Sequence, residues 1–507
     1  MLEVCKQLFC QWNDSDVRYC HWKSNEHLME GLDGETDLDV YVYPSDREMA
    51  ESLLTKCHYL ECKTQEAHRY PNVCEWIGFD NTTGRLIHVH LHYQIITGTK
   101  FCKEYVFPID DLIIATRVLD KDTNIYITDP NLEIIILYCR IALKAKTKHN
   151  IHLSKNDQKE IAYLKERLQT DIFKKLCKQL IDKEGETLYK LIMEEDLSCE
   201  GWYRVYQIAF YWLKPYRKYS PIYVFLRHKY YLTLYLFFLL ANRKFNCCFI
   251  NRKTFSNRHL SICFLGQDGS GKSTVTIELC KWLNWKIEAH RFYLGSGEHY
   301  KSLTKRLSSR ISRFRRKEDN QFHKEKVTCN QSKNKKKNLS NNTKSFVASI
   351  LVSWSLLGVA RRAYKEVRRA DRYMKNGGIP LFDRFPQVQF EGIYDGPKIN
   401  HYCQQKGISN GIVKWMARRE QRYLEKMQCF QPTLVFKLML PPEESIRRKP
   451  FENLEMVTRK HEITQQLQFP NSAVYTVDAT QDYQQEIIFI KNQIWNMLIQ
   501  DRNKKEY

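Results

Sequence analysis

A stretch near the middle of the chain has the residue types and spacing of a phosphate-binding loop. It reads Gly266-Gln267-Asp268-Gly269-Ser270-Gly271-Lys272-Ser273, is followed by Thr274, and matches the pattern G-x-x-x-x-G-K-[ST]. The glycines let the backbone turn so that successive N–H groups point inward, where they hold a phosphate together with a helix N-terminus. Lys272 adds a positive charge, and the Ser273 hydroxyl is placed to bind Mg²⁺. The sequence therefore predicts a site for a phosphate group and Mg²⁺.

The residues on either side of this loop predict the elements that must hold it in place. Residues 260–265 are a short apolar run typical of a buried strand, and residues 274–283 place apolar side chains on one helical face. Four further strands, separated by helical patterns, are expected at 286–294, 378–382, 433–440 and 473–477. This alternation predicts an α/β fold with a doubly wound parallel sheet, whose ligands gather at the carboxyl ends of the strands.

Two pairs of charged residues downstream suit phosphate chemistry at that edge. Asp383 and Arg384 directly follow a predicted strand, where a carboxylate can order Mg²⁺ ligands and a guanidinium can hold a second phosphate. Arg447 and Arg448 follow a helix start marked by two prolines and two glutamates. Arginines that close over the phosphates neutralise charge in the transition state. The predicted catalytic residues are therefore Lys272, Asp383, Arg384, Arg447 and Arg448.

Together these motifs resemble the thymidylate kinase family of nucleoside monophosphate kinases. The loop is similar to that family's phosphate loop, including the acidic residue within it, and Asp383-Arg384-Phe385 is similar to its D-R-[YH] motif. The resemblance implies ATP and Mg²⁺ as cofactors, Asp268 against the acceptor sugar and Arg384 on the acceptor phosphate. It implies transfer of the γ-phosphoryl group of ATP to a (deoxy)nucleoside monophosphate. Residues 295–299 lack that family's arginine-glutamate-proline run, so the sequence does not fix thymidylate as the acceptor.

A second acidic pattern lies near the N-terminus. Asp37 and Asp39 alternate with apolar residues after a glycine turn, so both carboxylates share one strand face, as a divalent-metal site for a nucleoside triphosphate requires. With Ser24 upstream, this block resembles the nucleotidyltransferase superfamily, which implies an α+β fold and Asp37 and Asp39 as Mg²⁺ ligands. Histidines stand where the family has its third carboxylate, with His90 as the best match, and imidazole is a poor Mg²⁺ ligand. Activity of this block stays open.

Length and composition set the domain organisation. A chain of 507 residues predicts a nucleotidyltransferase-like domain at 1–125, a helical connector at 126–255, and a thymidylate kinase-like domain at 256–507. Much of the net charge of +22 lies in a basic insertion at 301–345, of which 330–344 is predicted to be disordered. The insertion lacks interleaved aromatic residues, so nucleic acid is not an expected partner. The 17 cysteines form no Cys-x-x-Cys pair and the N-terminus lacks a signal-peptide pattern, so we expect a cytoplasmic chain with free thiols.

Three functions remain open on the sequence alone. The first is the nucleoside monophosphate kinase. The second is an enzyme that acts on a sugar or lipid-linked acceptor in surface polysaccharide metabolism, because Asp395-Gly396-Pro397 is similar to a thymidylate kinase-like branch often associated with bacterial surface polysaccharide genes. The third is a non-catalytic, regulatory nucleotide-binding protein.

The predicted binding partners follow from these three functions and from two apolar runs. The expected partner is a nucleotide or a phosphorylated small-molecule acceptor, and a homodimer is an open alternative. Neither 222–241 nor 346–360 is clearly transmembrane, and both lie beside basic residues. They are therefore read either as buried core helices or as peripheral membrane contacts.

Overall fold

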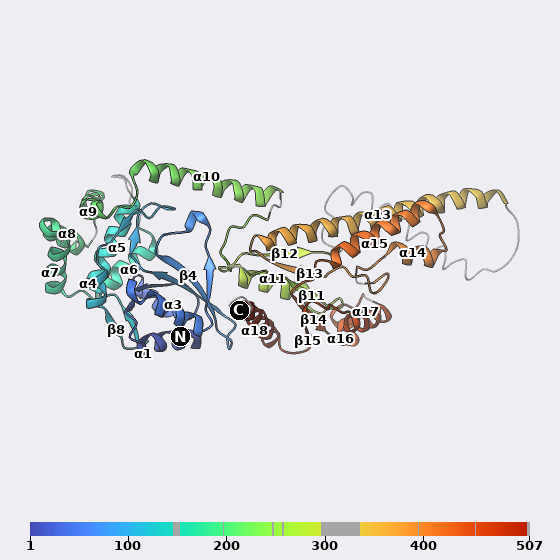
Figure 1. The fold of residues 1–507 in the computed structure, drawn as a ribbon, viewed down its shortest axis with the longest axis horizontal. Helices are drawn as coiled ribbons and strands as arrows, with labels where there is room; N and C mark the ends of the chain where they lie inside the picture. The colour runs from blue at the N-terminus through green and yellow to red at the C-terminus, as the bar shows by residue number, and fades with distance from the viewer. Residues whose placement is uncertain are drawn as a thin grey trace. The chain divides into compact units, whose positions relative to one another are not determined.

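The structure, a computed structural model, forms two compact units. The first comprises Met1–Ser256 and Trp495–Tyr507, and the second comprises Asn257–Ile494 (Figure 1). The division between them falls at the boundary expected near residue 256. The described residues are 1–145, 153–195, 197–245, 248–255, 258–295, 335–393, 395–451 and 453–503.

The first unit is built on a mixed eight-stranded sheet in the order β10-β3-β4-β5-β2-β1-β9-β8. Inside this sheet β4 and β5 are antiparallel, whereas β5 and β2 are parallel. A separate two-stranded sheet pairs β6 with β7. The strands are β1 (Tyr19–His21), β2 (Leu38–Val42), β3 (Leu60–Lys63), β4 (Val73–Phe79), β5 (Leu86–His92), β6 (Ile96–Thr97), β7 (Tyr105–Val106), β8 (Val118–Asp120), β9 (Ile125–Ile127) and β10 (Thr254–Phe255).

The turn between β4 and β5 sets the register of the hairpin. The Asp80 carboxylate accepts hydrogen bonds from the backbone N–H groups of Thr82 and Thr83, at 3.2 and 2.9 Å, which is the usual way an aspartate closes a turn. The resulting pairing places Glu75 on β4 directly opposite His90 on β5. Because neighbouring strands are only about 4.8 Å apart, opposite side chains on one face touch.

Four helices flank the strands of the first unit. The apolar residues of α1 and α3 join those of β2 and β5 in one buried cluster, so these helices cover one face of the sheet. Their most deeply buried side chains include Trp12 of α1 and Leu54 of α3. The helices are α1 (Glu3–Asp14), α2 (Leu28–Leu32), α3 (Arg47–Lys56) and α4 (Asp110–Thr116).

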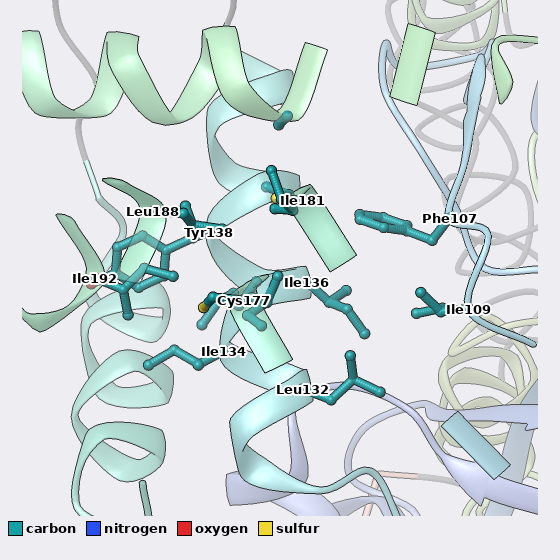
Figure 2. Packing of buried hydrophobic residues seen from close by; sticks show 14 of the residues in the cluster. Phe107, Ile109, Leu132, Ile134, Ile136, Tyr138, Cys177, Ile181, Leu188 and Ile192 are labelled. Carbon is teal, nitrogen blue, oxygen red and sulfur yellow. The ribbon is translucent and has the colours of Figure 1, made fainter. Parts of the chain in front are cut away.

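The helical middle of the chain shares a core with the first unit. Figure 2 shows α5 with Ile134 and Tyr138 facing Leu188 and Ile192 on one side, while Leu132 and Ile136 face Phe107 and Ile109 on the other. The predicted separate connector at 126–255 is therefore wrong as a domain, because α5 is apolar all round and is buried on both sides. The helices are α5 (Pro130–Ala145), α6 (Lys155–Lys165), α7 (Thr170–Ile181), α8 (Gly185–Met193) and α9 (Cys199–Leu213).

The second unit contains a five-stranded sheet in the order β12-β13-β11-β14-β15, and every neighbouring pair is parallel. All five expected strands are present, so the predicted parallel α/β sheet is confirmed. The chain moves from β11 to one edge of the sheet and then to the other, which makes the carboxyl end of β11 a switch point. The strands are β11 (Ile262–Leu265), β12 (Ala289–Tyr293), β13 (Ile379–Asp383), β14 (Leu434–Met439) and β15 (Ala473–Asp478).

Helices surround this parallel sheet. In Figure 1, α13 and α15 run side by side. The other helices of the unit include α11, which follows the glycine-rich loop, and α16 and α17, which lie between β14 and β15. The bounds are α11 (Lys272–Leu283), α13 (Lys335–Lys375), α14 (Ile399–Lys406), α15 (Gly411–Gln428), α16 (Pro442–Arg448), α17 (Leu454–Gln466) and α18 (Tyr483–Asn503), whose last turns belong to the first unit.

Helix α13 bears on two sequence expectations. It begins at Lys335, so the disorder expected over 330–344 is corrected from that residue onward, while 296–334 lies outside the described residues. Within the described part of the chain, its stretch Phe346–Lys375 contains an 18-residue window with a mean hydropathy of 1.3, so it is long and apolar enough to cross a membrane by length and composition. The end nearest β13 is a core helix, because Val367, Ala370 and Tyr373 are buried there.

Candidate functional site

The glycine-rich loop lies between the central strand of the parallel sheet and a helix. β11 ends at Leu265, and α11 begins at Lys272 with Gly271 as its N-cap at a φ of +84°. A glycine is needed there because this left-handed backbone strains other residues. A side chain at Gly266 would also collide with Ser270 Oγ and a backbone oxygen, each under 3.0 Å away. The unpaired N–H groups of the α11 N-terminus therefore open onto the loop, as anion binding requires.

Lys272 is buried beside the loop, although it carries a charge. Its ammonium donates hydrogen bonds to the backbone oxygen of Gln267 at 2.6 Å and to Ser270 Oγ at 3.4 Å. Burial, followed by the positive charge of Arg384, lowers the pKa of Lys272 to about 7. Lys272 thus donates to neutral oxygens only, and an anionic phosphate nearby would stabilise its charged form.

Asp383 meets the loop from the neighbouring strand β13. The hydroxyl of Ser273 donates to Asp383 Oδ2 at 2.7 Å, and Arg291 Nη2 of β12 lies 2.6 Å from the same oxygen. The other carboxylate oxygen, Asp383 Oδ1, is buried and has no hydrogen-bond partner in the described part of the chain. A hydroxyl next to a buried, unshared carboxylate oxygen is a donor set that fits Mg²⁺.

Asp268 and Arg384 form an ion pair across the same edge of the sheet. Arg384 Nη2 lies 2.8 Å from Asp268 Oδ1, and Lys460 of α17 donates to Asp268 Oδ2. Burial opposes the charge on Asp268, but Lys460 and Arg384 outweigh it and hold its pKa at about 2. Arg384 itself has a φ of +73°, an uncommon backbone state that aims its side chain at the loop. The two residues that the sequence linked to an acceptor therefore lie together.

The two predicted arginines of α16 differ in position. Arg448 donates to the backbone oxygens of Gly269 at 3.4 Å and Ala479 at 3.2 Å, so it lies against the loop. Arg447 pairs with Glu444 at 2.9 Å, and its side chain is 79% exposed. The remaining predicted loop residue, Thr274, is exposed in the first turn of α11. The structure thus brings Arg448 to the site and leaves Arg447 at the surface.

Two basic side chains of this site were not predicted from the sequence. Arg291 sits in β12 and pairs with Asp383, and Lys460 sits in α17 and pairs with Asp268. A signal for Arg291 was present, because it lies near the carboxyl end of the strand expected at 286–294, and ligands gather at that edge of a parallel sheet. Nothing in the local sequence distinguishes Lys460 from other exposed helix lysines.

The acidic pair of the first unit lies in a cluster of histidines and lysines. Both oxygens of Asp39 are engaged, since Lys23 Nζ lies 2.9 Å from Oδ2 while His90 Nδ1 and His92 Nε2 each lie 3.3 Å from Oδ1. Asp37 Oδ1 lies 2.8 Å from Nδ1 of the buried His88. Asp39 lies on β2 and Asp37 directly precedes this strand, and each already has cationic or imidazole partners.

Glu75 is an acidic residue of this cluster that the sequence analysis missed. Its Oε2 lies 2.7 Å from His88 Nε2, 2.9 Å from His90 Nε2 and 3.2 Å from Lys253 Nζ. The signal was available, because the turn expected at 81–84 already implied a register with Glu75 opposite His90. A third carboxylate is therefore present, on β4 rather than on β5, where His90 stands in its expected place.

The pKa values in this cluster are shifted by burial and by the contacts among its own charged groups. Burial opposes protonation of His90, but Glu75 and the hydrogen bond to Asp39 raise its pKa to about 9. Burial lowers the pKa of His92 to about 4, so this ring is neutral. Burial also opposes the charge on Asp39, yet Lys23 and the two histidines hold its pKa well below the usual range. Oxygens shared among lysine and histidine donors do not fit Mg²⁺, which prefers oxygen ligands and water.

Ser24 is also committed to internal contacts. Its backbone N–H donates to Glu160 Oε1 of α6 at 3.1 Å, and it adopts a left-handed φ of +58°. The neighbouring Asn25 donates to Glu133 Oε2 at 2.6 Å. The loop expected to hold a triphosphate is thus fixed to the helical part of the first unit.

The fold and the site define the second unit as an α/β unit with a phosphate-loop motif at the carboxyl edge of a parallel sheet. No protein-family model matches the chain. Two similar proteins of Escherichia coli (strain K12) are described as uncharacterized ATP-binding proteins. YghR is 28% identical over 228 residues, which is 44% of this chain and 81% of the relative. YghS is 27% identical over 223 residues, which is 43% of this chain and 84% of the relative.

One solved structure aligns with less than half of this chain. A deoxyadenosine kinase from M. mycoides with bound dATP aligns with 46% of this chain and 99% of its own, at 14% identity. The TM-score is 0.27, which is too low to show a shared fold.

Proposed function

We propose that the second unit transfers the terminal phosphoryl group of ATP to an acceptor that itself carries a phosphate, most simply a nucleoside monophosphate. The observation that carries this proposal is the pairing of Ser273 with Asp383 at 2.7 Å, beside a buried and unpaired Asp383 oxygen. This is the arrangement that a magnesium-bound triphosphate on the loop requires. The ATP-binding descriptions of the two Escherichia coli relatives support the donor.

Each residue of the site has a role in this reaction. Lys272 and the loop N–H groups hold the β- and γ-phosphates of the donor, and their fixed charges stabilise the negative charge that spreads over the transferring group. Ser273 and Asp383 are the side chains that would hold Mg²⁺, which, when bound, neutralises phosphate charge and orients the phosphate oxygens. Arg448 lies close enough to the loop to close over the transferring group.

The acceptor is placed by the pair Asp268 and Arg384. Arg384 leaves or shares its contact with Asp268 to bind the acceptor phosphate, because a guanidinium holds a phosphate in bidentate contact. Asp268 is then positioned to accept a hydrogen bond from the acceptor sugar. Thymidylate is the first acceptor to test because of the D-R motif, and other nucleoside monophosphates and phosphorylated sugars complete the panel.

An ADP-release assay with this acceptor panel tests the proposal on the full chain. We expect Lys272→Ala to lower turnover on the order of 10²–10³-fold, as removal of one charge-stabilising group does in other active sites. Lys281→Ala is the matched control, since this lysine is exposed at the far end of the same helix. Unchanged turnover in Lys272→Ala would contradict the proposal.

A second variant tests the acceptor side. Arg384→Ala should raise the KM of the acceptor on the order of tenfold or more, with a smaller change in the KM of ATP. Arg418→Ala, an exposed arginine of α15, serves as the control. Equal effects of Arg384→Ala on both Michaelis constants would show that Arg384 does not select the acceptor.

For the first unit we propose nucleotide binding without nucleotidyl transfer. The supporting observation is the occupation of both Asp39 oxygens by Lys23, His90 and His92. A chain carrying Lys272→Ala, incubated with each nucleoside triphosphate and Mg²⁺, should release no pyrophosphate while retaining nucleotide binding. Pyrophosphate release that stops on Asp39→Asn would overturn this role.

A further inference from the structure

Helix α10 (Pro221–Phe245) exposes an unusual amount of apolar surface on one side. Its exposed large apolar residues include two groups, one toward each end of the helix, that lie on the same helical face, with Lys229 and Thr233 between them on that face. We define this face as the α10 strip, which consists of Ile222, Phe225, Leu226, Leu236, Phe237 and Leu240. Phe225, Leu226 and Phe237 are each between 57% and 61% exposed. Exposed apolar surface of this kind marks an interaction site.

The opposite side of α10 is fixed to the first unit. Arg227 Nε donates to the backbone oxygen of Phe101 at 3.0 Å, and the Cys102 thiol donates to the backbone oxygen of Val224 at 3.6 Å. The ring of His228 lies 5.9 Å from that of Phe101. These contacts use positions on the face away from the α10 strip, and in Figure 1 the helix runs along the outside of its unit. The α10 strip is therefore held outward by a docked helix.

A basic cavity of about 790 Å³ opens at the start of the same helix. Its walls come from the segment between β6 and β7, the end of α5 and the first turns of α10. None of the residues that line it is acidic. Its basic side chains are Lys100, Lys103, Lys144, Arg217 and His228, and Phe225 belongs both to the cavity wall and to the α10 strip.

The positive charges of this cavity form few direct contacts with carboxylates of the described residues. Among the described residues, no carboxylate forms an ion pair with Lys103, Lys144 or Arg217, and Arg217 Nε is buried without a hydrogen-bond partner. Burial, followed by the charge of Lys144, Lys23 and Arg140, lowers the pKa of Lys103 to about 7. An anion in this half-buried cavity would stabilise the charged forms of these lysines.

We propose that α10 and the adjoining cavity form a docking site for an anionic lipid surface, with a lipid phosphate in the cavity and the α10 strip against the acyl region. The phosphate matches the unpaired cations, and the apolar face begins at the cavity wall, so one amphiphile satisfies both features. Exposed apolar side chains beside basic groups suit insertion into the headgroup region of an anionic membrane. The site belongs to the first unit and is independent of the proposed phosphoryl transfer.

The geometry favours a lipid surface over a second copy of the chain or a soluble phosphate. A second copy would bring its own basic cavity to the same face, and the two sets of cations would repel each other. A small phosphorylated molecule would fill the cavity and leave the α10 strip in water. Only an amphiphile with a phosphate head covers both.

Vesicle co-sedimentation of the full chain tests the proposal, with matched variants to separate this site from the general effect of a net charge of +22. Vesicles contain phosphatidylcholine with or without phosphatidylglycerol. The double variant Leu226→Gln and Phe237→Gln should weaken binding to the anionic vesicles on the order of tenfold or more. The uncharged control is Leu119→Gln with Met49→Gln, two exposed apolar residues elsewhere in the unit.

The cavity is tested by a charge-matched pair. Lys103→Ala should weaken vesicle binding about fivefold, the effect of one lysine at an anionic surface. Lys56→Ala, an exposed lysine of α3, should leave it unchanged. Equal losses in both lysine variants would mean that binding follows net charge alone, which would overturn the proposal. Thermal unfolding of each variant confirms that it folds.

Three other results would also overturn it. The first is loss of vesicle binding on Leu351→Gln with Trp354→Gln of α13, while the α10 variants still bind. The second is a dimer, seen by analytical ultracentrifugation, that dissociates in the α10 variants while vesicle binding is unchanged. The third is binding of glycerol 3-phosphate to the cavity by a parent chain that does not bind vesicles.

Discussion

Two acidic sites of this chain have similar sequence signatures, and they differ in how their carboxylate oxygens are used. Asp383 in the second unit accepts from Ser273 and pairs with Arg291 through Oδ2, while its buried Oδ1 has no hydrogen-bond partner among the described residues. Asp39 in the first unit has Lys23 on one oxygen and two histidines on the other. Both residues lie on strands whose neighbours carry further charges. The difference shows that the neighbours, not the carboxylate itself, decide whether a strand aspartate can take a divalent cation.

The two units differ in how far the charged groups of their acidic sites are already paired within the chain. In the second unit, Arg291 pairs with Asp383 Oδ2, but among the described residues Asp383 Oδ1 has no hydrogen-bond partner and the buried Lys272 forms no ion pair, so both groups can gain contacts from a charged ligand. The first unit has satisfied its acidic cluster with its own lysines and histidines, so it gains less from a cation. Substitutions of the carboxylates and of their partners test this difference between the two units.

The largest effect on turnover is expected at Asp383, whose Oδ1 has no hydrogen-bond partner among the described residues. Asp383→Asn should lower kcat/KM for ATP-dependent turnover on the order of 100-fold, because Mg²⁺ loses an anionic ligand. Asp39→Asn should leave the same quantity within about twofold, since its oxygens are already neutralised. The measurement is ADP release across a Mg²⁺ titration. Equal losses in the two variants would show that the first unit takes part in the same reaction.

The next effect is on stability in the first unit. Lys23→Met should lower the free energy of unfolding by about 3 kcal/mol, because it leaves the buried Asp39 without its ammonium partner. It should also open the cluster to Mn²⁺, which accepts oxygen and imidazole ligands alike. Thermal unfolding with and without Mn²⁺ measures both changes. If Mn²⁺ raised the Tm of the parent chain as much as that of the variant, the idea that Lys23 keeps a cation from Asp39 would be refuted.

A smaller effect is expected in proton uptake at the loop. The pKa of Lys272 is about 7 in the folded chain, below its ordinary 10.5, so between these values the unfolded chain holds more protons and rising pH favours the folded state. Bound phosphate restores the higher pKa, so ATP binding at pH 8 should take up about one proton. Calorimetry in buffers of different ionisation enthalpy measures this number. Lys272→Arg, which keeps its charge, should take up none.

The smallest effects concern the two arginines of α16. Arg448→Ala should lower turnover about tenfold, because Arg448 lies against the loop, whereas Arg447→Ala should change it less than about threefold. Steady-state kinetics of the two single variants give the ratio. A larger effect of Arg447→Ala would mean that α16 turns its other face toward the loop when substrates bind.

Much of the second unit could be predicted from sequence because its signals are local. The apolar run at 260–265 contains β11, and the glycine spacing locates the loop and the start of α11 within one residue or two. Asp383 and Arg384 were also accessible, since the carboxyl ends of parallel strands meet at one edge. Lys460 was not, because its contact with Asp268 depends on how α17 packs, and no short-range pattern encodes that.

The first unit was harder to predict because its features depend on pairing between distant segments. Glu75 lies four residues before the last residue of β4 and meets His90 only through the hairpin register. The helical middle was predicted to be a connector because its helices were considered one at a time. The run of apolar residues in α5 covers all sides of the helix, and that pattern indicates a helix buried on every side.

The buried position of α5 has a practical consequence for dividing the protein. Leu132 and Ile136 on one side, and Ile134 and Tyr138 on the other, belong to a single cluster with strand residues such as Tyr41. A truncation at residue 125 would therefore expose the core of the first unit on both sides of the cut. The smallest part of the N-terminal half that can be transferred to another protein, by an experimenter or by gene fusion, includes the helices as well as the sheet.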